Sequence, residues 1–90
     1  MNKKFKVNLD KVMSGMGYEL NLRYCDAGRN VYSTELWEIS IIEGLIFDNF
    51  ADGKRGVRAI DLIMYLKNCS FKDAHKILNN INMRVKNEYQ

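Results

Sequence analysis

The segment of residues 52–58 holds side chains and backbone groups that could bind a phosphate. Its sequence, Asp-Gly-Lys-Arg-Gly-Val-Arg, combines two glycines with three cations, Lys54, Arg55 and Arg58. Glycine lets a ligand approach the backbone closely, and a helix beginning after Arg58 would direct its unbonded N–H groups towards the segment. A phosphate-binding loop and an ordinary solvated turn are both consistent with this composition.

Aromatic residues near arginines make up a second candidate site. Bases of single-stranded nucleic acid commonly stack on aromatic rings that lie beside cations. The candidate rings near Arg23 and Arg29 are Tyr18, Tyr24, Tyr32 and Trp37. Most of them fall on alternating strand positions and are assigned to the core, but Tyr32 is out of phase with Trp37, so we predict that Tyr32 is exposed. The predicted nucleic-acid-binding residues are Lys54, Arg55, Arg58, Arg23, Arg29 and Tyr32.

The residues that usually perform catalysis or bind metals are sparse. The chain has one histidine, His75, and two cysteines, Cys25 and Cys69, too few for a four-ligand zinc site. The cysteines could pair, but the lysine-rich composition favours two reduced thiols, and His75 lies off the apolar stripe of its segment and is predicted at the surface. No Ser-His-acid or Cys-His grouping and no metal-carboxylate spacing is evident. We predict a protein that is not an enzyme and has no cofactor, no metal and no small-molecule substrate.

Composition predicts a single globular domain. The chain has 90 residues, of which 47% are hydrophobic and 28% charged, and its formal net charge of +3 permits an anionic partner without establishing one. No apolar stretch approaches the roughly 20 residues of a membrane-spanning helix. The basic start is followed by Asp10 and Lys11, where a signal sequence would be apolar. We predict a cytoplasmic protein that does not bind membranes.

The first part of the chain predicts a short helix followed by a strand. Asn8 can cap a helix over residues 9–16, where apolar residues recur at helical spacing, and Gly17 ends it. Residues 18–24 alternate between apolar and polar types, which is the pattern of a strand with one buried face. Turn-forming residues follow at 26–30.

The central part predicts further antiparallel strands. The alternation over residues 37–41 favours a strand. The pair Glu43-Gly44 predicts a tight hairpin into a second strand over residues 45–50. The glycine-containing segment 51–56 is predicted to be a loop.

Two helices are predicted in the last third. The first begins near Ala59 with a wide apolar face, and Asp61 is placed to cap this helix or to pair with Arg58. Ser70 has the character of an N-cap, with an acidic residue three positions later, and predicts a last helix over residues 71–82.

Together these elements predict an α+β fold with an N-terminal helix, a three- to four-stranded antiparallel meander and two C-terminal helices packed on the sheet. One domain is expected over residues 1–90, with flexible tails at 1–7 and 84–90.

Two motifs in the carboxyl half are typical of a known family. Residues 56–66, Gly-Val-Arg-Ala-Ile-Asp-Leu-Ile-Met-Tyr-Leu, form a glycine turn into a helix with an Ile-Asp pair. Residues 69–74, Cys-Ser-Phe-Lys-Asp-Ala, contain a Ser-Phe-x-x-Ala entry to the next helix. In these motifs and their spacing, residues 37–79 resemble the zinc-ribbon domain of bacterial DNA primases and its degenerate relatives in mobile genetic elements.

The resemblance implies a zinc-ribbon-like domain without metal. Cys25 falls near the family's first cysteine, but no histidine follows it, and the family's later cysteine pair falls at about Phe50 and Gly53. Apolar packing around Phe47 and Phe50 is therefore expected in place of the zinc.

The resemblance also implies a function. It implies a non-catalytic accessory subunit of a mobile-element DNA replication or priming complex, which binds single-stranded template DNA and a larger DNA polymerase or helicase subunit. Catalysis is not implied, because the primase active site lies in a different domain of those proteins. The alternative, from another class, is a small protein-interaction module or an inhibitor of a host nucleic-acid enzyme.

Overall fold

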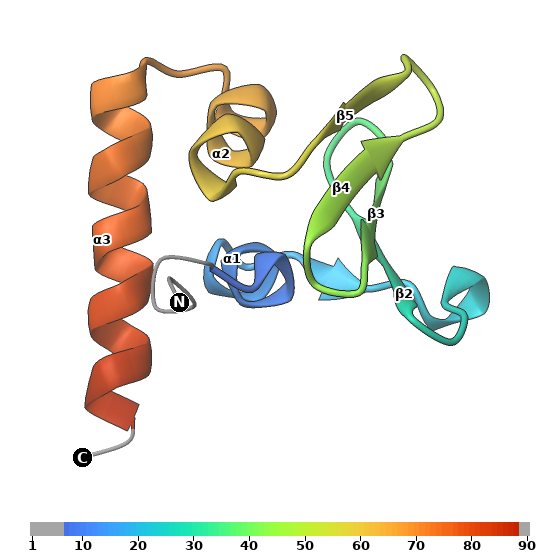
Figure 1. Ribbon diagram of the computed structural model, residues 1–90, viewed down its shortest axis with the longest axis horizontal. Helices are drawn as coiled ribbons and strands as arrows, with labels where there is room; N and C mark the ends of the chain where they lie inside the picture. Colours follow the sequence, from blue (N-terminus) through green and yellow to red (C-terminus); the bar gives the residue numbers. More distant parts are fainter. Residues whose placement is uncertain (1–6, 89–90) are drawn as a thin grey trace.

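The computed structural model describes the backbone of residues 7–88 and the side chains of residues 7–82 (Figure 1). In chain order its elements are α1 (Leu9–Gly15), β1 (Glu19–Leu20), the 3₁₀ turn η2 (Leu22–Tyr24), β2 (Arg29–Ser33), β3 (Glu38–Ile42), β4 (Ile46–Asn49), β5 (Lys54–Gly56), α2 (Ala59–Lys67) and α3 (Phe71–Glu88).

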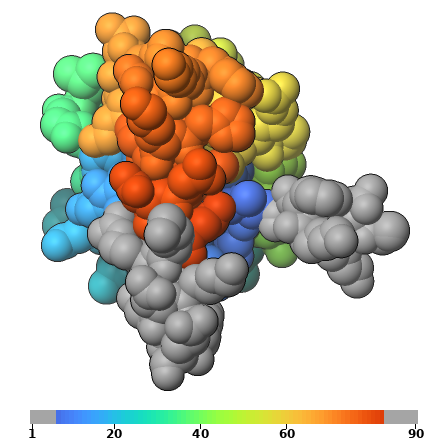
Figure 2. Space-filling model, turned by 90° about the vertical axis from the view of Figure 1, so that its left-hand side faces the viewer, coloured from blue at the N-terminus to red at the C-terminus, as the bar shows by residue number. Residues whose placement is uncertain are grey.

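The elements form three layers. The strands make one antiparallel meander in the order β1-β2-β3-β4-β5. Helices α1 and α2 lie between this sheet and α3 (Figure 1), and α3 forms an outer side of the molecule (Figure 2). The predicted α+β fold, with an N-terminal helix, an antiparallel meander and two C-terminal helices packed on the sheet, is confirmed apart from the number of strands. We call the sheet face that points away from α1 and α2 the outer face; none of the described helices covers it.

The core lies between the inner face of the sheet and the helices. Ile39, Ile41 and Phe47 are fully or almost fully buried and come from β3 and β4. They contact the buried face of α2, which includes Leu62 and Ile63. The remaining buried core residues come from α1, β2, the start of α2 and α3: Leu9, Val12, Met13, Tyr32, Ala59, Ile60, Ala74, Leu78 and Ile81.

Local signals place the starts of the helices where they were predicted. The Asn8 side chain accepts a hydrogen bond from the Asp10 N–H at 2.8 Å and caps α1. The Ser70 hydroxyl accepts one from the Asp73 N–H at 3.1 Å and caps α3. Asn68 ends α2 in the left-handed conformation, with a φ of 51°. Helix α3 extends beyond its predicted end at residue 82, since no glycine or proline follows to stop it. The predicted tail residues 1–6 and 89–90 lie outside the described part of the chain.

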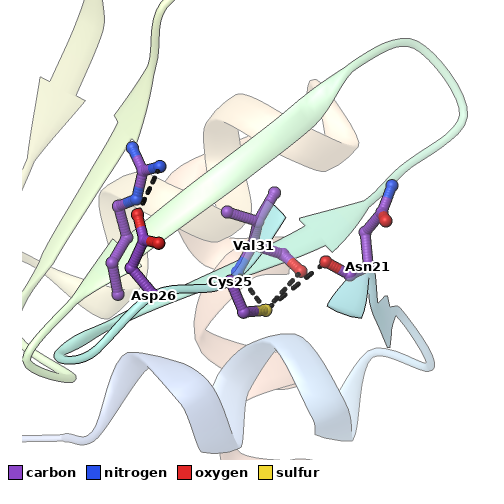
Figure 3. Close-up of polar contacts among 5 residues, drawn as sticks. Asn21, Cys25, Asp26 and Val31 are labelled. Carbon is purple, nitrogen blue, oxygen red and sulfur yellow. Dashed lines mark hydrogen bonds and ion pairs between the residues drawn. The ribbon is translucent and has the colours of Figure 1, made fainter. Parts of the chain in front are cut away.

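The strand predicted over residues 18–24 is mostly absent. Only Glu19–Leu20 pairs with β2, after which Leu22–Tyr24 forms a 3₁₀ turn with exposed side chains. Cys25 stabilises this turn, because its Sγ accepts a hydrogen bond from the Val31 N–H at 3.3 Å and lies 3.4 Å from the Asn21 carbonyl oxygen (Figure 3). Contacts with β2 therefore override the alternating pattern.

The hairpin between β3 and β4 is confirmed, and two strands, β2 and β5, were not predicted. Glu43 and Gly44 both have positive φ angles, 55° and 73°, as a two-residue hairpin turn requires. The predicted loop at residues 51–56 contains β5, which pairs with β4, so the sheet has five strands rather than three or four. Lys54–Gly56 has no apolar alternation because it is an edge strand exposed to solvent.

Candidate nucleic-acid interface

The register of the sheet decides which predicted cations share a face. Val31, Ser40, Asp48 and Arg55 are cross-strand neighbours from β2 to β5 and form one row. The neighbouring row contains the core residue Phe47, so the first row lies on the outer face. Arg29 belongs to the outer face as well, because it is two residues from Val31 on the same strand.

The three cations of the glycine-containing segment point in different directions. Lys54 lies over the Tyr65 ring of α2, with its Nζ 5.9 Å from the ring centroid, on the inner side of the sheet. Arg55 follows it and lies on the outer face. Arg58 occupies the N-cap position of α2, where its Nε lies 3.6 Å from Asp61 Oδ2, which confirms the predicted pair. The structure does not bring these cations together around one phosphate.

Tyr32 is not available for stacking. Its side chain is 5% exposed, and its hydroxyl donates a hydrogen bond to Asp10 Oδ1 at 2.7 Å. Burial, followed by this hydrogen bond, raises the pKa of the Tyr32 phenol well above its ordinary value. The prediction that Tyr32 is exposed is wrong, because the turn closed by the hydrogen bonds between Thr34 and Trp37 interrupts the alternation from which it was argued.

Two exposed aromatic rings flank a cleft on the outer face. Tyr24 of η2 is 50% exposed, and Phe50, in the turn after β4, is 77% exposed. The cleft has a volume of about 310 Å³. It is lined by Tyr24, Arg29, Val31, Trp37, Glu38, Ser40, Asn49, Phe50 and Ala51.

The position of Phe50 corrects one expectation. Phe47 is buried in the core as predicted. Phe50 was expected to pack beside it where the related domains bind zinc, but its side chain is exposed. Phe50 follows the last residue of β4, so it lies on the turn and projects into solvent. Sequence reasoning missed this residue as a site candidate; its place directly before the Ala51-Asp52-Gly53 turn residues was the available signal.

The Tyr65 side chain of α2 holds the turn that carries Phe50. Asn49 Nδ2 donates to the Tyr65 hydroxyl at 2.7 Å, and Asn49 Oδ1 accepts from the Ala51 N–H at 2.8 Å. The Tyr65 hydroxyl donates to Asp52 Oδ2 at 2.5 Å, and this bond, followed by one from the Lys54 N–H, lowers the pKa of the Asp52 carboxyl. Burial is the main cause that raises the pKa of Tyr65. The turn is therefore fixed to the helix layer.

Two predicted arginines lie near the cleft. Arg29 Nη2 is 3.1 Å from Asp26 Oδ2, an ion pair that orients the guanidinium (Figure 3). Arg29 Nε is buried and has no hydrogen-bond partner among the described residues. Arg23 is exposed on η2, the turn that also carries Tyr24.

The cysteines and the histidine make no metal site within residues 7–82. Cys25 and Cys69 are both free thiols, as predicted, and His75 is exposed, with its ring edge-on to Phe71 at a centroid distance of 4.7 Å. No group of three or more His, Cys, Asp or Glu residues in the described part of the chain could hold a metal ion. Among the described helices, none has the length and apolar character to cross a membrane.

Comparison of the chain with protein-family models, with curated proteins and with solved structures gives no match. The structure itself defines a small α+β domain with a five-stranded antiparallel meander and its α-helices on one side of the sheet. The resemblance to primase zinc ribbons rests on the motifs of the sequence alone.

Proposed function

We propose that this chain is a non-catalytic, cytoplasmic module that binds single-stranded DNA on the outer face of its sheet. The observation that carries this proposal is the pair of exposed rings, Tyr24 and Phe50, beside Arg29 around one cleft. Aromatic rings stack on bases whatever their sequence, and cations beside them bind the phosphates of the same strand.

The distribution of cations supports this surface. Arg55 lies on the outer face, and Arg23 is exposed on the turn that carries Tyr24. With Arg29 they place three guanidinium groups on or beside the sheet face that carries the exposed rings. Guanidinium groups bind phosphate oxygens with two parallel hydrogen bonds, which suits a flexible strand.

The role within a cell extends this proposal. By its resemblance to degenerate primase zinc ribbons, the chain serves as an accessory subunit of a mobile-element replication or priming complex. It would present template DNA to a larger DNA polymerase or helicase subunit.

The experiment is a binding titration of a fluorescent single-stranded oligonucleotide with the full chain. We expect the double variant Arg23→Ala, Arg55→Ala to weaken binding roughly tenfold, because two phosphate contacts are lost. The matched control is Lys72→Ala, Lys76→Ala, which removes the same charge from exposed positions of α3, on the other side of the molecule. Equal losses in both variants, or no binding by the unaltered chain, would contradict the proposal.

A second candidate function is a protein-interaction module, and an apolar groove favours it. The groove has a volume of about 630 Å³ and lies where the β3–β4 turn, the β5–α2 connection and α3 meet. Leu45 and Val57 on its walls are 47% and 65% exposed. It is lined by Val7, Leu45, Ile46, Val57, Arg58, Ala59, Ile60 and Leu78. Its occupant would be an apolar segment of the polymerase, helicase or host enzyme that the chain binds.

The two functions separate experimentally. The variant Leu45→Asp, Val57→Asp places charges in the groove and is expected to abolish co-purification with a co-expressed partner enzyme. Its affinity for single-stranded DNA should stay within about twofold of the unaltered chain, because neither residue lies on the outer face. If partner binding survives this variant, the groove is not the docking site.

A further inference from the structure

The cleft on the outer face is lined by aromatic residues, which suits the binding of one flat group; we call this cleft the slot. Three aromatic residues from segments far apart in the sequence line it: Tyr24 of η2, Trp37 directly before β3, whose ring stacks on α2, and Phe50 of the β4–β5 turn. A volume of about 310 Å³ is at the lower end for ligand sites, which fits one small planar group better than a large molecule.

Both hydrogen-bond donors and hydrogen-bond acceptors line the same slot. Arg29 lines the slot, and its guanidinium offers hydrogen-bond donors only; its Nε–H is itself buried, without an acceptor among the described residues. Glu38 contributes an exposed side chain whose carboxylate only accepts hydrogen bonds when ionised. Between their strand positions lie the buried side chains of Val31 and Ser40. A ligand that fills this slot must offer both donors and acceptors on its edges.

We infer that the slot receives a single base of the bound DNA strand and favours guanine. Guanine presents two adjacent donors, N1–H and N2–H, which match a carboxylate such as Glu38, and two acceptors, O6 and N7, which match an arginine such as Arg29. Cytosine lacks the adjacent donors, and adenine and thymine lack both pairs. This inference rests on the proposed function, because the strand delivers the base.

The slot is held in shape before any ligand binds. Trp37 stacks on Tyr65 of α2, with ring centroids 6.2 Å apart and planes 8° apart. Asn49 and Tyr65 fix the turn of Phe50 through the hydrogen bonds described above, and Asp26 holds Arg29. A preformed site loses less conformational entropy on binding, so a single base can contribute measurable affinity.

The test uses the fluorescence of Trp37, which is the only tryptophan of the chain and reports directly on the slot. The full chain is titrated with an oligothymidine that carries one central guanine, and with the same strand carrying an abasic site there. Strands with adenine or cytosine at that position complete the series. We expect the guanine strand to bind about tenfold more tightly than the abasic strand and to change the emission of Trp37.

Variants separate stacking from base recognition. Phe50→Ala is expected to remove most of the difference between the guanine and abasic strands. Glu38→Gln is expected to reduce the affinity for the guanine strand to that for the adenine strand, because an amide offers only one acceptor to the two donors of guanine. The control Phe71→Ala removes another exposed phenylalanine ring, from α3, and should leave all affinities unchanged. Circular dichroism confirms that each variant is folded.

The outcomes distinguish the slot from the proposed function. If the guanine and abasic strands bind equally and Trp37 emission is constant, the slot is refuted while DNA binding by the outer face stands. If no strand binds but deoxyguanosine monophosphate alone quenches Trp37, the slot stands and the single-strand function is refuted. If neither the strands nor the four free nucleotides bind, both are refuted.

Discussion

At the scale of single residues, Asp10 connects the first helix to the sheet. Its Oδ1 accepts hydrogen bonds from the Tyr32 hydroxyl at 2.7 Å and from Asn30 Nδ2 at 3.1 Å. Both donors lie on β2, so one carboxylate fixes α1 against this strand. A hydrogen bond to a charged group stabilises more than one between neutral groups.

The variant Tyr32→Phe should therefore lower the free energy of unfolding by about 1–2 kcal/mol at pH 7. The ring keeps its packing, and Asp10 loses one of its two donors. Urea denaturation measures the change. Tyr24→Phe is the control, since the Tyr24 side chain is exposed and its loss of a hydroxyl should change stability by less than about 0.5 kcal/mol. Equal effects of the two variants would show that the bond to Asp10 contributes nothing.

The raised pKa of Tyr32 also predicts how stability depends on pH. In the unfolded chain the phenol releases its proton near pH 10, whereas in the folded chain it holds the proton to higher pH. The stabilisation that the protonated Tyr32 phenol gives to the folded chain is thus complete below pH 10 and is lost as the pH rises above it. We expect the free energy of unfolding to fall above pH 10, and less steeply in Tyr32→Phe. Identical slopes in both proteins would contradict this assignment.

At the scale of elements, β5 approaches the core through a residue that has no side chain. A Cβ at Gly56 would lie 2.7 Å from the Phe47 ring, although the backbone of Gly56 does not require glycine. Gly56→Ala should cost about 1–3 kcal/mol of stability through this overlap alone. The loss of stability caused by Gly56→Ala should be smaller in a chain that already carries Phe47→Leu, because the ring is then absent. A double-mutant cycle measures the coupling energy between the two positions. Additive costs would mean that the contact is not the cause.

The same edge strand predicts which cation of its segment binds DNA. Arg55 lies on the outer face, whereas Lys54 lies over Tyr65 and Arg58 pairs with Asp61. Arg55→Ala alone should therefore account for most of the loss of DNA affinity in the triple variant Lys54→Ala, Arg55→Ala, Arg58→Ala. The double variant Lys54→Ala, Arg58→Ala is the control. If this control loses as much affinity as Arg55→Ala, the strand passes over both sides of the hairpin.

At the scale of the whole molecule, the net charge of +3 is too small to bind DNA by itself, so the arrangement of cations decides the affinity. Two phosphate contacts, from Arg23 and Arg55, predict a slope of about −1.4 for the logarithm of the binding constant against that of the salt concentration. The double variant Arg23→Ala, Arg55→Ala should bring the slope close to zero. An unchanged slope in this variant would place the phosphates elsewhere.

Much of the fold follows from short stretches of sequence. Asn8 and Ser70 predict helix starts, Glu43-Gly44 predicts a hairpin, and the alternation around Ile39 and Ile41 predicts a strand. Each of these signals acts between residues at most four positions apart. Each can therefore be recognised without knowing how the rest of the chain folds. The α+β class follows from their order.

Other features depend on contacts between distant segments. The chain leaves the strand conformation after Leu20 because Cys25 bonds to the backbone of Val31, and the polar strand β5 exists because β4 pairs with it. The predicted cations separate onto different faces because strand alternation divides Lys54 from Arg55. No local propensity encodes these pairings.

The sequence by itself thus determined the class of fold, the caps and the central hairpin, because these depend on the intrinsic preferences of neighbouring residues. Only the tertiary structure decided that Tyr32 is buried, that Phe50 is exposed, and that Tyr24, Trp37 and Phe50 line one cleft. The physical reason is that burial and proximity are set by the register of the sheet and by the layer of helices on one of its faces. A cleft formed by three distant segments exists only once that register is established.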